Sequence, residues 1–142
     1  MSVFKRIFMK KPSELGYNLT LLIARVGFGG MMLTHGWPKF VNYQERASSF
    51  PDPLGIGNEI SLAMAIFSEL ICAALLVIGF ASRLVLIPLM FTMFVAGMIV
   101  HMDDPFSRKE MALLYLVAYF VLFVTGPGKY SLDYALFGKK RR

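Results

Sequence analysis

Two ionisable residues stand inside stretches that are otherwise apolar. Arg25 is the single charge between about residues 18 and 36, and Glu69 is the single charge between about residues 60 and 80. A charge within a membrane helix costs about 3 kcal/mol on insertion scales, so such residues indicate a structural or functional role. Measured from the same end of the two stretches, Arg25 lies about 10–12 Å deep and Glu69 about 16 Å deep. The sequence therefore predicts that Arg25 and Glu69 pair between antiparallel neighbouring helices.

Three roles remain open for these two charges. The pair fixes the register of the two helices, or it lines a polar pocket or proton path. Alternatively, Arg25 alone extends to the headgroups on the cytoplasmic side. Removing one member of a buried pair leaves the other uncompensated and costs about 3–5 kcal/mol, so single and double substitutions distinguish these roles.

A second polar group gathers at the opposite, external ends of the apolar stretches. Imidazoles and carboxylates bind divalent metals, but the two histidines are far apart in the chain and no HxxxH or HxxE pattern is present, so the sequence predicts no metal site. The side chains are satisfied at the membrane interface, or they form the polar mouth of a pocket for a quinone or small solute. The members of this predicted mouth are His35, Lys39, His101, Asp103, Asp104 and Glu110.

Two tyrosines lie one helical turn apart in the last apolar stretch. We expect Tyr115 and Tyr119 to face the helix interior, where their hydroxyl groups need partners. They fill the interior with aromatic rings, or they line a pocket and take part in its chemistry. The sequence contains no nucleophile elbow, phosphate-binding loop, haem signature or zinc motif, and its single cysteine, Cys72, cannot form an intramolecular disulfide. No catalytic residue is therefore assigned.

The elements that hold these residues are predicted to be four membrane-spanning helices. Of 142 residues, 56% are hydrophobic and 17% are charged, whereas soluble domains carry about 25% charged residues. This composition excludes a disordered chain and a disulfide scaffold. A helix of about 20 apolar residues crosses the hydrocarbon core. The short connections predict one all-α domain (residues 1–142), an up-down-up-down four-helix bundle with spans at about 18–36, 60–80, 84–102 and 108–126.

The distribution of basic residues predicts the orientation of the bundle. Ten of the 15 Lys and Arg residues lie on the side of the two termini, four lie on the opposite side, and Arg25 is the remaining one. Because basic residues are enriched in cytoplasmic loops, we expect both termini in the cytoplasm and a multi-pass protein of the plasma membrane. The basic tail is then a topology signal that attracts anionic lipids, and nucleic acid is not expected as a partner. The long loop at about 37–59 is external.

Three stretches of the chain resemble the DoxX family of small membrane proteins. LLIARVGFGGMMLTHGWPKF (21–40) has an arginine followed by His-Gly and Lys, SELICAALLVIGFASR (68–83) has a glutamate and a glycine before a basic turn, and GPGKYSLD (126–133) is similar to the family's ending. The resemblance implies a four-helix membrane protein associated with redox complexes, because relatives include a subunit of a thiosulfate:quinone oxidoreductase. By motif matching it points to Arg25, His35, Gly36, Lys39, Glu69, Glu110 and Asp133.

The leading functional hypothesis is a membrane subunit or accessory factor of a quinone-linked oxidoreductase complex, not catalytic alone. A quinone is the one cofactor that it suggests, held in a pocket around Arg25 and Glu69 and lined by Tyr115 and Tyr119, because quinone pockets are apolar with a few polar groups. The expected partners are the lipid bilayer and either other proteins of a membrane complex or further copies of this chain. The alternative is a small-solute transporter or a membrane-protein assembly factor without redox activity.

Overall fold

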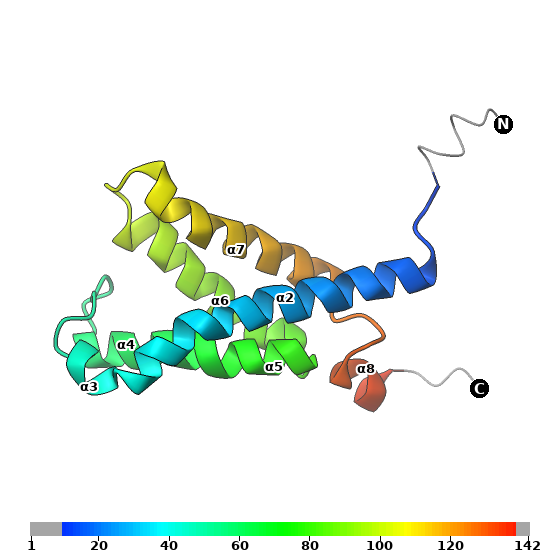
Figure 1. Cartoon of the computed structure of the whole chain (residues 1–142), viewed down its shortest axis with the longest axis horizontal. Coiled ribbons are helices and arrows are strands. Elements are labelled where there is room, and N and C mark those ends of the chain that lie inside the picture. The colour runs from blue at the N-terminus through cyan, green and yellow to red at the C-terminus, as the bar shows by residue number, and fades with distance from the viewer. Residues whose placement is uncertain (1–9, 139–142) are drawn as a thin grey trace.

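The computed structural model describes residues 10–138, and every regular element in that range is helical. Four long helical stretches follow one another and run back and forth along the molecule (Figure 1). They are α2 (Glu14–Val41), then α4, η1 and α5 in line (Asn58–Ile66, Phe67–Cys72 and Ala73–Ile78), then α6 with η2 (Ser82–Val95 and Ala96–Val100), and α7 (Phe106–Thr125). The short helices are α3 (Tyr43–Arg46) and α8 (Leu132–Phe137). The segments η1 and η2 are π-helical.

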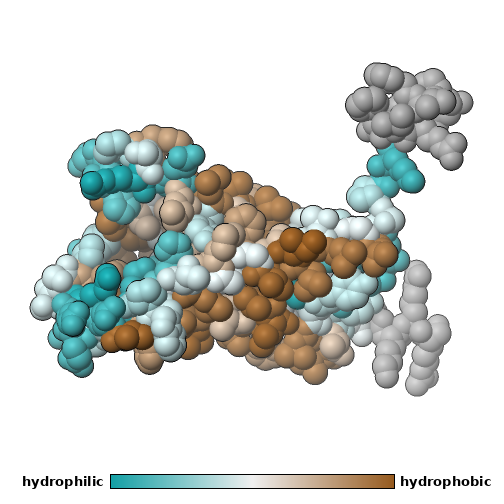
Figure 2. All heavy atoms as spheres, in the orientation of Figure 1, coloured by the Kyte–Doolittle hydropathy of each residue, from teal (hydrophilic) through white to brown (hydrophobic). Residues whose placement is uncertain are grey.

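Three of the described helical stretches are long and apolar enough to cross a membrane: Glu14–Val41, Asn58–Ile78 and Ser82–Val100. They correspond to the first three predicted spans. The fourth prediction corresponds to α7, which is not among the three and carries Arg108, Lys109 and Glu110 near its start. Apolar residues cover much of the middle of the molecule in Figure 2, and hydrophilic residues gather at the end that holds α3.

The first helix is longer at both ends than the sequence predicted. It begins at Glu14 because the Ser13 hydroxyl accepts a hydrogen bond from the backbone N–H of Gly16, which caps the helix. It continues to Val41 through Pro38, which the sequence analysis assigned to the external loop. The non-helical part of that loop is therefore Asn42 and residues 47–57.

Close contact between α2 and the stretch η1–α5 depends on glycines. A Cβ atom on Gly36 would lie 2.7 Å from the backbone carbon of Glu69, and one on Gly29 would lie 2.8 Å from the Val77 side chain. Small residues at such positions allow helix backbones to approach each other. These contacts define an antiparallel register in which Gly36 faces Glu69 and Arg25 lies against Gly79.

The buried core lies among α2, η1, α5, α6 and α7. It is apolar and includes both tyrosines predicted to face inward. A smaller cluster of Ala47, Leu62 and Ile66, covered by Phe50, fastens the loop at residues 47–57 to α4. The helices pack closely toward the α8 end, whereas the loop at the α3 end is held by its own small cluster (Figure 1).

We predict that Gly36→Ala weakens the packing of α2 on η1. The added methyl group would meet backbone atoms of Glu69 and Leu70, which cannot rotate away, so we expect a loss of about 1–3 kcal/mol in the free energy of unfolding. Gly30→Ala is the matched control, because nothing lies within 4 Å of its Cβ position and alanine favours a helix by up to about 1 kcal/mol. Unfolding by SDS titration in micelles measures both variants, and equal stability of the two would contradict this packing.

Candidate functional site

The predicted ion pair between Arg25 and Glu69 does not form. Glu69 pairs with Lys39 of α2, and Arg25 donates only to backbone carbonyls among its described hydrogen bonds. The helix register explains the error, because Gly36 and not Arg25 faces Glu69. Eleven residues separate Arg25 from Gly36, which is about 16 Å along a helix. Lys39 lies one turn beyond Gly36 and is close enough to reach the carboxylate.

Arg25 is a buried structural clamp. Its side chain is 2% exposed and donates from Nη1 to the carbonyl of Pro127 at 2.5 Å, from Nη2 to that of Tyr130 at 2.6 Å and from Nε to that of Val77 at 3.4 Å. The planar guanidinium suits this role because its donors point in fixed directions. Arg25 thereby joins α2 to the end of α5 and to the segment that precedes α8.

Asp133 completes this end of the molecule. Its carboxylate accepts hydrogen bonds from the backbone N–H groups of Ala81 at 2.7 Å and Ser82 at 2.8 Å, while its own N–H donates to the Gly79 carbonyl at 2.8 Å. It also lies within electrostatic range of Arg25. Residues from the three stretches quoted in the sequence analysis thus meet in one network, which holds the chain ends of α5 and α6 together.

The Lys39–Glu69 pair lies at the other end of α2. The Lys39 ammonium contacts Oε2 of Glu69 and also donates to the His35 carbonyl at 3.4 Å. The Glu69 side chain is 6% exposed and that of Lys39 is 21% exposed, so the pair is largely shielded from solvent. An ammonium group has three donors and a carboxylate has two acceptor oxygens, so the pair retains the capacity to bind a further polar group.

The pair borders a cavity of about 410 Å³ near the α3 end of the molecule. Its walls come from α4 and η1 on one side and from α6 and η2 on the other, and residues 50–56 of the loop before α4 cover it. Most of the lining is apolar, and the volume falls in the range of about 300–1,000 Å³ that is typical of small-molecule sites. The polar lining residues are Lys39, Ser61, Ser68, Glu69, Thr92 and His101.

Both π-helical segments contribute to this cavity. Glu69 belongs to η1, and His101 directly follows η2. The Ser68 hydroxyl of η1 donates to the Pro88 carbonyl of α6 at 3.1 Å and holds these helices together beside the cavity. Single π turns within α-helices occur frequently at functional sites, because they redirect side chains.

A hydrogen-bonded clasp fastens the loop over the cavity. Asp52 accepts hydrogen bonds from the backbone N–H groups of Ile56 at 3.0 Å and Gly57 at 2.8 Å, and from the Ser61 hydroxyl at 2.9 Å. The Gly57 hydrogen bond is the main reason that the pKa of Asp52 lies below its usual value. Asn58 donates to the Phe50 carbonyl at 2.7 Å from the start of α4.

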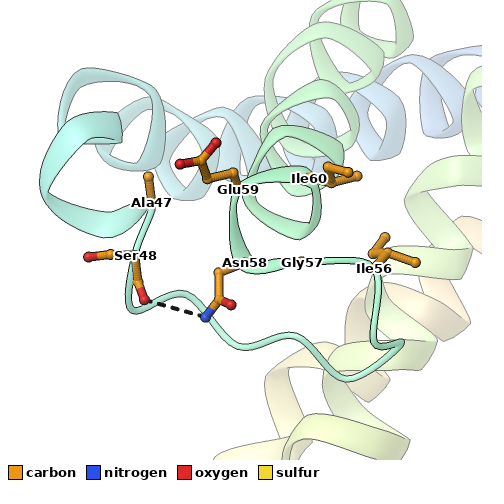
Figure 3. Close-up of a pocket in the computed structure, with 7 residues that line it drawn as sticks. All are labelled: Ala47, Ser48, Ile56, Gly57, Asn58, Glu59 and Ile60. Carbon is orange, nitrogen blue, oxygen red and sulfur yellow. Dashed lines mark hydrogen bonds between the residues drawn. The ribbon is translucent and has the colours of Figure 1, made fainter.

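A second hollow of about 350 Å³ lies between the loop and the start of α4. Figure 3 shows the side-chain amide of Asn58 reaching across it to the carbonyl of Ser48, a distance of 3.5 Å. Glu59 is the one charged residue among those that line it, and it has no ion-pair partner among the described residues. This hollow lacks the buried donor and acceptor of the larger cavity, which is therefore the stronger candidate site.

The predicted external mouth is only partly assembled at the cavity. Lys39 and His101 line it, whereas His35 is exposed and packs its ring edge-on against Tyr115, with ring centroids 6.0 Å apart. Asp103 and Glu110 are also exposed and lie outside the lining. His101 Nδ1 lies 2.7 Å from Asp104, and this hydrogen bond lowers the pKa of Asp104.

The two tyrosines lie inside the core and not on the cavity wall. Tyr115 is buried and Tyr119 is 0% exposed, with ring centroids 5.7 Å apart. Both interact electrostatically with Glu69. Within residues 10–138 the Tyr119 hydroxyl has no hydrogen-bond partner. Their role in the structure is therefore to fill the core with aromatic rings.

Sequence reasoning missed most of the cavity. The participation of Ser68 and Thr92 and the closure by residues 50–56 follow from the way that α6 and the loop fold around η1. The one available signal was the spacing between Gly36 and Lys39, which places a flexible cation one turn beyond a close helix contact. That signal becomes informative only when the partner of Gly36 is known.

Long apolar helices with a shielded ion pair define a helical membrane protein. The comparisons with known proteins identify it further: the chain belongs to the DoxX family, whose profile matches residues 20–102. It is similar to an uncharacterised protein of Haemophilus influenzae, with 30% identity over 134 residues that cover 87% of each chain. No solved structure matches the chain. The matched residues include Arg25, Lys39 and Glu69, whereas the segment around Asp133 lies outside them.

We predict that Lys39 and Glu69 are energetically coupled. Glu69→Gln leaves the ammonium without its carboxylate, and we expect a loss of about 3 kcal/mol in the free energy of unfolding, at the low end of the range because Lys39 is 21% exposed. The double substitution Lys39→Met with Glu69→Gln removes both charges and should recover at least half of that loss, and Lys39→Met alone completes the cycle. A double-mutant cycle by SDS titration measures the coupling, and additive losses would argue against the pair.

We predict that the Asp52 clasp opens at low pH. Because the folded-state pKa lies below the usual 3.8, the clasp contributes stability that is complete well above pH 3.8 and is lost as the pH falls through the folded-state pKa. Hydrogen exchange of the Gly57 amide, corrected for the intrinsic rate, should show protection that declines in this range. Asp52→Asn should give weak protection at every pH. Protection that does not change with pH in the unsubstituted protein would contradict the assignment.

Proposed function

We propose that this chain is a quinone-binding subunit or accessory factor of a redox complex in the plasma membrane. One observation carries the proposal: an apolar cavity of suitable size ends at a shielded ammonium–carboxylate pair. Quinone sites combine an apolar pocket with a few polar groups that orient the head. The membrane setting follows from family membership and from the three apolar helices, while the redox association comes from the resemblance described above.

The proposed topology is a four-helix bundle with both termini in the cytoplasm. In this arrangement α7 is the fourth span, and its charged residues Arg108, Lys109 and Glu110 lie at the external surface. The excess of basic residues near the two termini supports this orientation. The cavity then lies in the external half of the membrane, because it borders the α3 end of the helices.

The Lys39–Glu69 pair would hold the head group. The Lys39 ammonium has two described partners, Glu69 Oε2 and the His35 carbonyl, so a third N–H remains for a ligand carbonyl. The second oxygen of Glu69 can accept a hydrogen bond from a ligand hydroxyl. The same site therefore suits both a carbonyl and a hydroxyl form of one head group.

A quinone, when bound, supplies carbonyl groups that take up electrons together with protons. The residues of this chain would orient the head and hold or release a proton at the Glu69 carboxylate. A partner protein would exchange the electrons. His101 borders the same cavity, and because its Nδ1 contacts Asp104, its Nε2 is the nitrogen left for a ligand.

Purification of the full chain in mild detergent tests the proposal. We expect ubiquinone or menaquinone to copurify at near-stoichiometric level and to be lost, at least tenfold, in Lys39→Met, because one hydrogen bond to a charged group contributes about 1.5–3 kcal/mol. Thr92→Phe fills the cavity without altering the pair and should also abolish retention. Lys11→Met, an exposed lysine outside the cavity, is the matched control.

Thermal unfolding of each variant shows that loss of quinone does not reflect loss of fold. If Lys39→Met and Thr92→Phe retained as much quinone as the unsubstituted protein, the quinone would bind outside this cavity. A chain that purifies without quinone and with a stable protein partner would support an assembly factor instead. Uptake of a water-soluble solute by vesicles that contain the chain would support a transporter. Either result would overturn the quinone proposal.

A further inference from the structure

We infer that the cavity opens sideways into the membrane between Phe67 of η1 and Phe91 of α6, and that its ligand therefore carries a hydrocarbon tail. This inference rests on the proposed function and adds a route and a ligand class to it. The ligand is a lipid-dissolved molecule whose polar head contacts Lys39 and Glu69. Its tail leaves through the opening and lies among the acyl chains.

The first observation is that the two phenylalanines belong both to the cavity wall and to the outer surface. Phe67 is 53% exposed and Phe91 is 46% exposed, and both line the cavity. Each is the tenth residue of its candidate span, counted from Asn58 and from Ser82. Because the spans are antiparallel, both side chains lie near the middle of the hydrocarbon layer, where their exposed surface contacts lipid and not water.

The second observation is that the two walls separate toward the external end. A hydrogen bond from the Ser68 hydroxyl to the Pro88 carbonyl joins the two walls at the inner end of the cavity. Beyond that contact α6 diverges from α4, as Figure 1 shows. The apolar side chains of Met64, Phe67 and Phe91 are all exposed along this divergence, so the gap between the walls faces lipid.

The third observation is that the aqueous end is covered. Apolar side chains of the loop, among them Phe50, Pro51 and Leu54, line the cavity at this end. The Asp52 and Asn58 hydrogen bonds hold this segment to α4. A ligand arriving from water would have to displace an apolar cover that is fastened by several hydrogen bonds, whereas no described hydrogen bond holds the side chains of Met64, Phe67 and Phe91 on the lipid side.

The ligand class follows from the arrangement of polar atoms. Lys39 and Glu69 form one charged locus in a largely apolar wall, so the site matches a molecule with one polar head and an apolar remainder. A cavity of about 410 Å³ accommodates a head group and the first part of a tail. The rest of a long tail would extend past Phe67 and Phe91 into the bilayer.

A bulky label placed at the opening tests the inference. In a Cys72→Ala background, Phe91→Cys is compared with Phe94→Cys, which is also exposed on α6 but does not line the cavity. Both are reconstituted in nanodiscs and modified with a pyrene maleimide. Dissociation constants are then measured for a ubiquinone with a long isoprenoid tail and for the same head group without a tail.

We expect the label at position 91 to weaken binding of the long-tailed quinone about tenfold or more, a change of about 1.4 kcal/mol or more. Binding of the tail-less head group should change less than about threefold, and the label at position 94 should affect neither ligand. An unchanged affinity for the long-tailed quinone, or an equal loss for both ligands at position 91, would overturn the sideways route. Failure of the unmodified protein to bind either quinone would instead reject the proposed function.

Discussion

The register of α2 against η1 and α5 determines where the buried charges of this protein lie. Gly36 allows the backbone of α2 to touch that of Glu69, and Gly29 repeats the contact two turns away. With this register fixed, Lys39 reaches Glu69 and Arg25 reaches the end of α5. A shift of one turn would move each cation by about 5.4 Å and separate it from its partners. The packing of small residues therefore determines which charged groups can meet at the site.

The protein stabilises buried Arg25 and partly exposed Lys39 in different ways. Arg25 is surrounded by backbone carbonyls, whose positions are set by the chain, and its fork of donors joins three segments. Lys39 is neutralised by a single side chain and keeps a donor that the described contacts do not use. The first arrangement is structural, because the three described acceptors are backbone carbonyls of neighbouring segments. The second retains capacity for a ligand, and it is the one that borders a cavity.

Much of the fold can be predicted from the sequence, because runs of about 20 apolar residues are long enough to define spans by themselves. The pairing of charges cannot. The pairing depends on the full length of α2, which begins at the Ser13 cap and continues through Pro38. It also depends on which residues the glycines of α2 contact, and the sequence alone does not reveal these partners. The sequence predicts that Arg25 and Glu69 form one pair, whereas in the structure Glu69 contacts Lys39 and Arg25 contacts backbone carbonyls. The π-helical turns have no clear sequence signature, so the cavity walls were not predictable.

The cavity differs from a packing defect in a way that bears on its role. In water, an apolar crevice is costly because its surface stays hydrated, whereas in a bilayer acyl chains enter such a crevice and remove most of that cost. Acyl chains cannot satisfy Lys39 and Glu69 at its inner wall, since hydrocarbon offers neither donors nor acceptors. A lipid-dissolved molecule with a hydrogen-bonding head satisfies both parts at once. The combination of exposed Phe67 and Phe91 with a shielded ion pair therefore favours such a molecule over lipid and over water.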